Sequence, residues 1–166
     1  MNVNELLTEG YDRLPDLVRD AVKGLSPEQL RWAPAEGANS IGWLVWHLTR
    51  VQDDHVAEIL EQDQVYAADG WPRRFGLSDA SDTGYGHTPA QVAAVRPESD
   101  QALIDYYDAV HARTRQFLAG LSPADLDRVV DERWDPPVTL GVRLVSVLDD
   151  DSQHVGQAAY VRGLLS

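Results

Sequence analysis

Four long stretches of the chain repeat apolar residues at intervals of three and four, the spacing that places them on one face of an α-helix. These stretches cover residues 4–23, 41–64, 98–119 and 140–165. At 1.5 Å per residue, a helix of about 22 residues is roughly 33 Å long. Four helices of similar length, each with a single apolar face, predict an all-α, up-and-down-type four-helix bundle.

Short segments between these stretches carry signals for the start of a helix. A Ser-Pro or Thr-Pro pair begins at residues 26, 88 and 122, and each pair combines a capping hydroxyl with a proline at the first helical position. The motif "GLSPEQL" at 24–30 recurs as "GLSPADL" at 120–126, and a long helix with an early glycine follows each copy, Gly42 and Gly141. The repeat indicates two helical hairpins related by approximate two-fold symmetry.

The stretch from residue 65 to residue 97 has no long helical pattern and contains "WPRRFGL" and "SDTGYGHT". Connections of this length inside a compact domain are uncommon and are often functional. Two interpretations remain open: the segment covers a pocket, or it only crosses from one helix to the next. Strand signals are weak throughout. We therefore expect one domain over residues 1–166, with a long connection between its second and third helices.

Composition excludes several classes of function. The chain has 14 Lys and Arg against 27 Asp and Glu, a net charge of −13, so nucleic acid and anionic membranes are poor partners. Without cysteine there is no disulfide, thiolate ligand or cysteine nucleophile. The start "MNVNELLTEGYDRL" has no apolar segment typical of a signal peptide, and no apolar run is long enough to span a bilayer. These features favour a cytoplasmic protein acting on a small-molecule substrate.

The apolar face of the last helix contains Asp151 and His154, and Asp150 lies one turn before His154. His47 lies on the flank of the apolar face of the second helix. Taken alone, His47 is typical of a structural histidine and Asp150 of a solvated helix residue. A buried carboxylate or imidazole without a partner costs several kcal/mol, so a group of them must satisfy one another or hold an ion.

Helical bundles hold metals with ligands from facing helices, often including an i, i+4 pair. We therefore predict a divalent metal site formed by His47, Asp150 and His154, with Asp151 as the alternative carboxylate. Two imidazoles and a carboxylate leave a coordination position open, as catalytic sites require, and favour Zn²⁺, with Ni²⁺ or Fe²⁺ as alternatives.

"IGWLVWHLTRVQDDH" together with "VLDDDSQHVGQAAYVRGL" resembles the DinB-like (YfiT-like) superfamily. The similarity extends over essentially the whole chain and points to the branch related to the metal-binding domain of mycothiol-dependent maleylpyruvate isomerase. It implies a four-helix bundle with a divalent metal on His47, Asp150 and His154. It also implies that a low-molecular-weight thiol such as mycothiol serves as cosubstrate in S-transfer or isomerisation.

Three further residues are candidates for a role at the site. His55 is a candidate catalytic base or extra ligand, or else a helix-surface histidine. Arg73 and Arg74 are candidates for binding the carboxylates of a thiol or substrate, or else plain loop charges.

Three functions remain open: a thiol-dependent transferase or isomerase, a metal-dependent hydrolase, and a non-catalytic metal- or ligand-binding module of a stress response. Small side chains on the last helix permit a close helix–helix approach, either in a homodimer or within the chain. They are Gly156, Ala158, Ala159 and Gly163.

Overall fold

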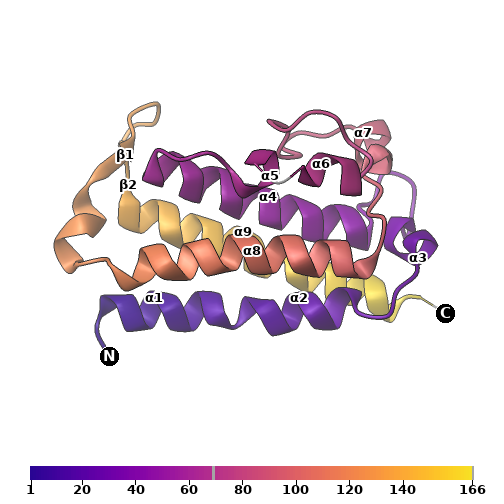
Figure 1. Ribbon diagram of the computed structural model, residues 1–166, viewed down its shortest axis with the longest axis horizontal. Helices are drawn as coiled ribbons and strands as arrows, with labels where there is room; N and C mark the ends of the chain where they lie inside the picture. Colours follow the sequence, from indigo (N-terminus) through magenta and orange to yellow (C-terminus); the bar gives the residue numbers. More distant parts are fainter. Residues whose placement is uncertain (69, 166) are drawn as a thin grey trace.

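The computed structural model describes residues 1–68 and 70–165. Four long helical bodies lie side by side, and the segment between α4 and α8 crosses over one side of them (Figure 1). The long bodies are α1 (Val3–Asp12) continued by α2 (Leu14–Val22), α4 (Ile41–Leu60), α8 (Asp100–Ala119) and α9 (Leu140–Gly163). The short elements are α3 (Pro27–Arg31), α5 (Val65–Ala68), α6 (Trp71–Arg74), α7 (Pro89–Ala94), the 3₁₀ helix η1 (Pro123–Asp127), β1 (Val129–Asp131) and β2 (Val138–Thr139). The expected all-α bundle with a long second connection is confirmed.

Side-chain hydrogen bonds give the relative directions of the helices. The Tyr11 hydroxyl donates to the Leu144 carbonyl near the start of α9, and Arg162 near its end donates to the Ala21 carbonyl. The α1 half therefore lies beside the start of α9 and the end of α2 beside the end of α9, so the two bodies run parallel.

The directions of α4 and α8 differ from those of an up-and-down bundle. Arg50 in α4 donates to the Tyr106 hydroxyl, while Arg113, further along α8, donates to the Asp63 carbonyl just beyond α4. The two helices are therefore parallel, as the colours in Figure 1 also show. A parallel neighbour needs a crossover along the whole bundle, which explains the length of the second connection.

The four predicted helices are found within four residues of their expected bounds, but the first of them is broken at Arg13. Pro15 lacks an amide N–H and its ring crowds the carbonyl four residues earlier, so the helix does not continue unbroken through this point. At the end of α4, Glu61 adopts a left-handed conformation (φ 53°), and the helix stops at Leu60 rather than residue 64. Ser99 caps the N-terminus of α8 through its side chain.

The short helices begin where the proline pairs predicted, and α3 and α7 both have complete capping boxes. The repeat also has a structural counterpart. A Cβ on Gly42 would lie 2.9 Å from the Leu30 carbonyl oxygen, and one on Gly141 would lie 3.3 Å from the Leu126 Cβ. Leu30 and Leu126 occupy the same position of the two motifs, so each glycine lets a long helix pack closely on the short helix before it.

The antiparallel ribbon of β1 and β2 was not expected. Its strands contain three and two residues, too few for an alternating pattern to be visible in the sequence.

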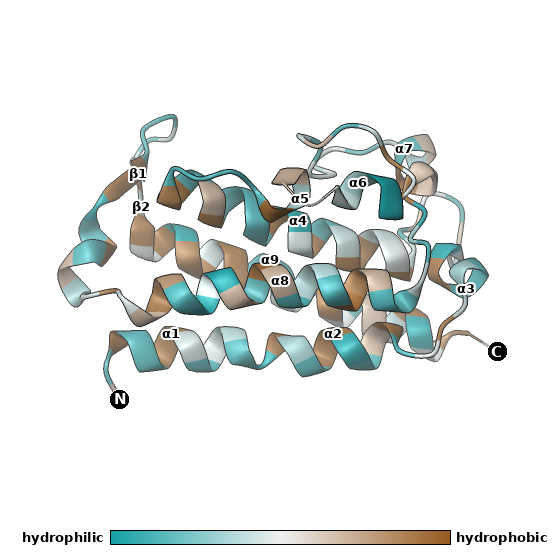
Figure 2. Ribbon diagram, viewed as in Figure 1, coloured by the Kyte–Doolittle hydropathy of each residue, from teal (hydrophilic) through white to brown (hydrophobic). Residues whose placement is uncertain are grey.

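The core lies between the four long bodies, and each of them carries apolar residues interspersed with polar ones (Figure 2). Tyr11, Leu44, Tyr107 and Leu144 are buried representatives of the four bodies. Within residues 1–68 and 70–165, no helix combines the length and the apolarity needed to cross a bilayer.

Candidate metal centre

Helices α4 and α9 bring the three predicted ligands together. His47, Asp150 and His154 each offer one ligand atom, and these atoms all lie within 4.8 Å of one another. Asp150 Oδ1 is 3.6 Å from His154 Nε2, and the two imidazoles lie edge to face with ring centroids 4.9 Å apart. The group could hold a metal ion.

The imidazole of His47 is fixed on two sides. Its ring stacks on Trp43 with centroids 4.6 Å apart, and its Nδ1 donates a hydrogen bond to the Thr83 carbonyl, at 2.5 Å. With the proton on Nδ1, the lone pair of Nε2 is available for a ligand. Burial lowers the pKa of His47, which favours the neutral form that coordination requires.

His154 has its hydrogen-bond partner within α9. Its Nδ1 lies 3.0 Å from Gln157 Oε1, an acceptor, so this nitrogen carries the proton and Nε2 is the one beside Asp150. Metal-ligating histidines almost always donate their second ring nitrogen to a fixed acceptor, which sets tautomer and orientation. His47 meets this condition through the Thr83 backbone carbonyl, whereas the acceptor for His154 is the exposed side chain of Gln157.

The carboxylate of Asp150 supplies the test of whether these residues fit a cation. Its Oδ2 is buried and has no hydrogen-bond partner within the part of the chain that the structure describes. A buried carboxylate oxygen without a donor is costly, and a divalent cation between Asp150 and the histidines would remove that cost. Bonds of about 2.0–2.2 Å place tetrahedral ligand atoms roughly 3.4 Å apart, so shifts of about 1 Å close the group around an ion. The residues fit a divalent cation.

Asp151, the alternative carboxylate, does not belong to the group. Its side chain is fully buried in the core, and burial raises its pKa well above the usual range. Burial is also the main cause of the raised pKa values of the phenols of Tyr11 and Tyr107, and the charge of Asp151 adds to it. The predicted choice of Asp150 over Asp151 therefore agrees with the geometry.

A cavity of about 670 Å³ opens beside the candidate centre. His47 and Asp150 line one end of it. Val51, one turn after His47, and Val147, one turn before Asp150, provide an apolar stretch. His55 also lines the cavity, but it lies eight residues beyond His47, which is about 12 Å along the helix axis. That separation excludes His55 as a ligand of the same ion, and its role as a base stays a prediction.

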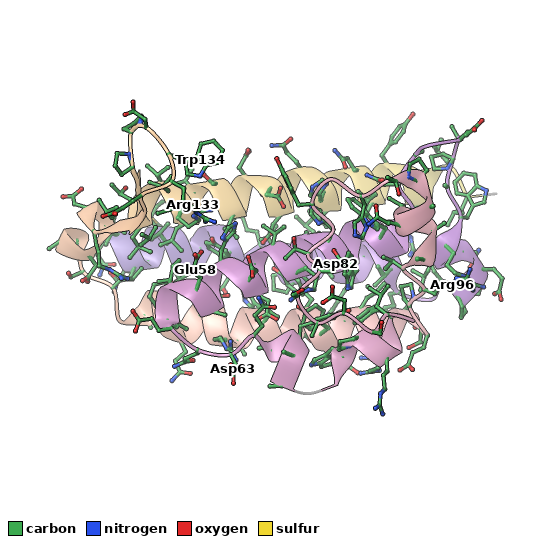
Figure 3. All side chains as sticks on the ribbon, turned by 90° about the horizontal axis from the view of Figure 1, so that it is seen from above. Glu58, Asp63, Asp82, Arg96, Arg133 and Trp134 are labelled. Atoms are coloured by element: carbon green, nitrogen blue, oxygen red, sulfur yellow. The ribbon has the colours of Figure 1, made fainter. Side chains whose placement is uncertain are left out.

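The far end of the cavity is built on an ion-pair group. Asp131 accepts hydrogen bonds from Arg133 at 2.8 Å and from Arg143 at 2.7 Å, and these bonds hold its pKa well below the usual range. Arg143 also contacts His55, 3.2 Å from its Nε2, and the pKa of His55 is lowered by burial and then by this guanidinium. Figure 3 shows Arg133 and the exposed Trp134 together at the end of the bundle that carries the β-ribbon.

The two loop arginines lie elsewhere. Arg73 and Arg74 belong to α6 and are not among the residues that line the cavity. Arg74 pairs with Glu98 and Asp105, and its guanidinium lies 4.9 Å above the Trp71 ring. The structure does not bring these arginines to the metal ligands, and their contact with a substrate stays a prediction.

Residues 79–87, called the 79–87 loop below, form part of the site. In the sequence, this loop is visible only as part of a long connection without a helical pattern. Thr83 and Tyr85 line the cavity. Gly84 has a φ of +89°, and a Cβ there would lie 2.8 Å from His47 Nδ1. The segment "SDTGYGHT" was the only signal, because the contact to His47 is made by a backbone carbonyl, which any residue type supplies.

Comparison with known proteins places this architecture in a family. Residues 11–158 match the DinB superfamily. The crystal structure of a conserved protein from Enterococcus faecalis is similar, with 33% sequence identity and a TM-score of 0.89 over 98% of this chain and 96% of that one. No curated protein matches the chain. The match over most of the chain and the shared fold show that the protein belongs to the DinB superfamily.

Proposed function

We propose that the protein is a metal-dependent enzyme that uses a low-molecular-weight thiol such as mycothiol in an S-transferase or isomerase reaction. The observation that carries this proposal is the three-ligand group at the wall of a cavity. Three protein ligands leave a coordination position for a substrate atom, whereas structural zinc sites are closed by four protein ligands. The sequence resemblance to the mycothiol-dependent branch supports the choice of thiol.

The roles of the chain's own residues follow from their contacts. His47 and His154 would hold the cation through Nε2, and Asp150 would contribute the anionic ligand. When bound, the cation would lower the pKa of a thiol or water in the open position. Val51 and Val147 supply an apolar wall near the ligands, which limits competing hydration of a reactive thiolate.

The donor set suits Zn²⁺ best, with Ni²⁺ and Fe²⁺ as alternatives. Zn²⁺ takes two imidazole nitrogens and one carboxylate oxygen as its protein ligands in three-ligand catalytic sites. The same set is the two-histidine, one-carboxylate arrangement of non-haem iron enzymes.

A metal-dependent hydrolase is the second candidate, because the open position can take water in place of a thiol. A non-catalytic ligand-binding module would use the same cavity without turnover. The cavity's mixture of charged and apolar lining fits a small polar molecule in all three cases.

A paired screen separates these functions. Zinc-loaded protein is incubated with an electrophile such as monobromobimane, with and without mycothiol, and with a panel of ester and amide substrates. We expect thiol-dependent consumption of the electrophile above the uncatalysed rate, and we expect Asp150→Ala to lose it. Thiol-independent hydrolysis would select the second candidate, and no turnover under either condition would contradict an enzymatic function.

The homodimer also remains a proposal. Gly156 and Gly163 have open space beside them and Tyr160 is exposed, whereas Ala158 is buried in the chain's own core. We expect light scattering to give the mass of two chains at micromolar concentration; the mass of one chain would contradict a dimer.

A further inference from the structure

Arg50 is a completely buried arginine, one turn after the candidate ligand His47 on α4. Its Nε donates to the Asp82 carbonyl at 3.0 Å, and its Nη2 donates to the Ala80 carbonyl at 3.0 Å and to Gln64 Oε1 at 2.7 Å. A buried guanidinium is unfavourable unless its charge and its donors are matched. Two of its main partners are backbone carbonyls of the 79–87 loop.

The charge of Arg50 is balanced by Asp53 on the same helix, and two tyrosines from other helices complete its surroundings. Its Nη1 lies 3.5 Å from Asp53 Oδ2 and 3.2 Å from the Tyr106 hydroxyl, and the guanidinium lies 4.1 Å from the centre of the Tyr66 ring. Replacing a buried ion pair with apolar side chains is often neutral or stabilising. Fold stability alone therefore does not account for an arginine here, and its contacts with the loop offer a specific reason.

The loop that Arg50 holds is the one that orients His47. Asp82 and Thr83 are consecutive residues, and their carbonyls accept from Arg50 and from His47 respectively. Two donors one turn apart on α4 thus bind adjacent peptide groups of the same loop. In Figure 3, Asp82 lies over α4, in agreement with these contacts. If the Asp82 carbonyl moves, the Thr83 carbonyl and the imidazole bound to it move as well.

We infer that Arg50 is a positioning residue of the metal centre: it holds the 79–87 loop so that the Thr83 carbonyl fixes the tautomer and orientation of His47. The inference rests on the proposed metal site, although its structural part concerns only the chain's own residues. Partners that orient a metal-bound histidine typically change metal affinity by about 10–100-fold when they are removed.

The test compares Arg50→Lys with Arg113→Lys. Lysine keeps a positive charge near Asp53, but it replaces the separate Nε and Nη2 donors to the Asp82 and Ala80 carbonyls with a single ammonium group. Arg113 is a matched control, because it donates to the backbone carbonyl of Asp63 and lies 3.8 Å from Asp53, without contacting the 79–87 loop.

Two properties are measured for each variant. The first is the dissociation constant for Zn²⁺, from competition with a chromophoric chelator. The second is the tautomer of His47 in metal-free protein at pH 8, from nitrogen chemical shifts of the imidazole. We expect Arg50→Lys to bind Zn²⁺ about tenfold more weakly and to populate the Nε2–H tautomer. We expect Arg113→Lys to match the parent protein in both properties.

Unchanged affinity and tautomer in Arg50→Lys would overturn the inference, and so would equal losses in both variants. If Arg50→Lys does not fold, hydrogen–deuterium exchange of the parent protein decides instead: protection across the 79–87 loop supports the inference and unprotected exchange overturns it. If the parent binds no metal, the proposed function fails, while the tautomer still decides the role of Arg50.

Discussion

Replacing Gly84 with alanine should weaken metal binding through direct displacement of His47. The new Cβ would lie 2.8 Å from His47 Nδ1 and 2.8 Å from Trp46 Cζ3, whereas ordinary contacts begin at 3.4 Å. The difference between 3.4 and 2.8 Å requires the imidazole, the indole or the loop to shift by about 0.6 Å in total. Metal–ligand bonds tolerate deviations of only about 0.2 Å.

We therefore expect a loss of about 10–100-fold in Zn²⁺ affinity, which corresponds to about 1.4–2.8 kcal/mol. Gly86→Ala is the matched control. Gly86 also has a positive φ, +72°, but open space surrounds its Cβ position. Both variants incur a backbone strain of about 1–2 kcal/mol, visible as a lower melting temperature of metal-free protein, and only Gly84→Ala adds the contact with His47.

The assay is isothermal titration calorimetry of metal-free protein with Zn²⁺, accompanied by thermal unfolding of each variant. Equal affinities of Gly84→Ala and Gly86→Ala would refute the reasoning, because they would show that the contact at His47 has no influence on the ion.

Three further predictions concern ligands and protons. Calorimetric titration should find that His154→Ala abolishes stoichiometric Zn²⁺ binding and that Asp150→Ala weakens it strongly. Asp151→Ala should leave Zn²⁺ affinity unchanged, because Asp150 and not Asp151 belongs to the ligand group. A larger loss of Zn²⁺ affinity in Asp151→Ala than in Asp150→Ala would contradict the assignment. Burial lowers the pKa of His47, so protons should compete with Zn²⁺ only below the usual imidazole pKa of about 6.5, and equilibrium dialysis showing release above that pH would argue against imidazole ligands. The two arginine partners lower the pKa of Asp131, so this carboxylate stabilises the folded state above pH 3.8, and the stabilisation is lost as the pH falls below that value. Denaturant titrations should show that the free energy of unfolding falls less steeply with decreasing pH in Asp131→Asn than in the parent protein. An equally steep fall in both proteins would contradict this prediction.

The sequence predicted the bundle and the grouping of His47, Asp150 and His154 because both depend on side-chain types at helical spacing. The i, i+4 pair Asp150 and His154 lies on one helix, so its geometry follows from the helical repeat alone. His47 could be added because a polar residue near a buried face needs a partner. Asp150 and Asp151 differ by a rotation of about 100° around one helix, and in the structure it is Asp150 that lies beside the two histidines.

The sequence could not predict features made by backbone groups or by contacts between distant segments. Thr83 acts through its carbonyl, and Arg50 reads in the sequence as an ordinary helical arginine although it is fully buried. The direction of α8 depends on which end of the bundle the 65–97 connection reaches, and no local pattern encodes that. Arg143 in α9 lines the cavity and is bound there by Asp131 in β1. The strands of the β-ribbon are too short to be predicted from an alternating pattern, so this contact could not be predicted either.

X-ray absorption spectroscopy at the zinc edge, on protein loaded with one equivalent of Zn²⁺, tests the central claim most directly. The account predicts a first shell of nitrogen and oxygen at about 2.0–2.2 Å with the multiple-scattering signature of two imidazoles. That signature should fall to one imidazole or vanish with the bound metal in His47→Ala. A shell of oxygen ligands without imidazole, or an unchanged spectrum in His47→Ala, would contradict a metal centre formed by His47, Asp150 and His154.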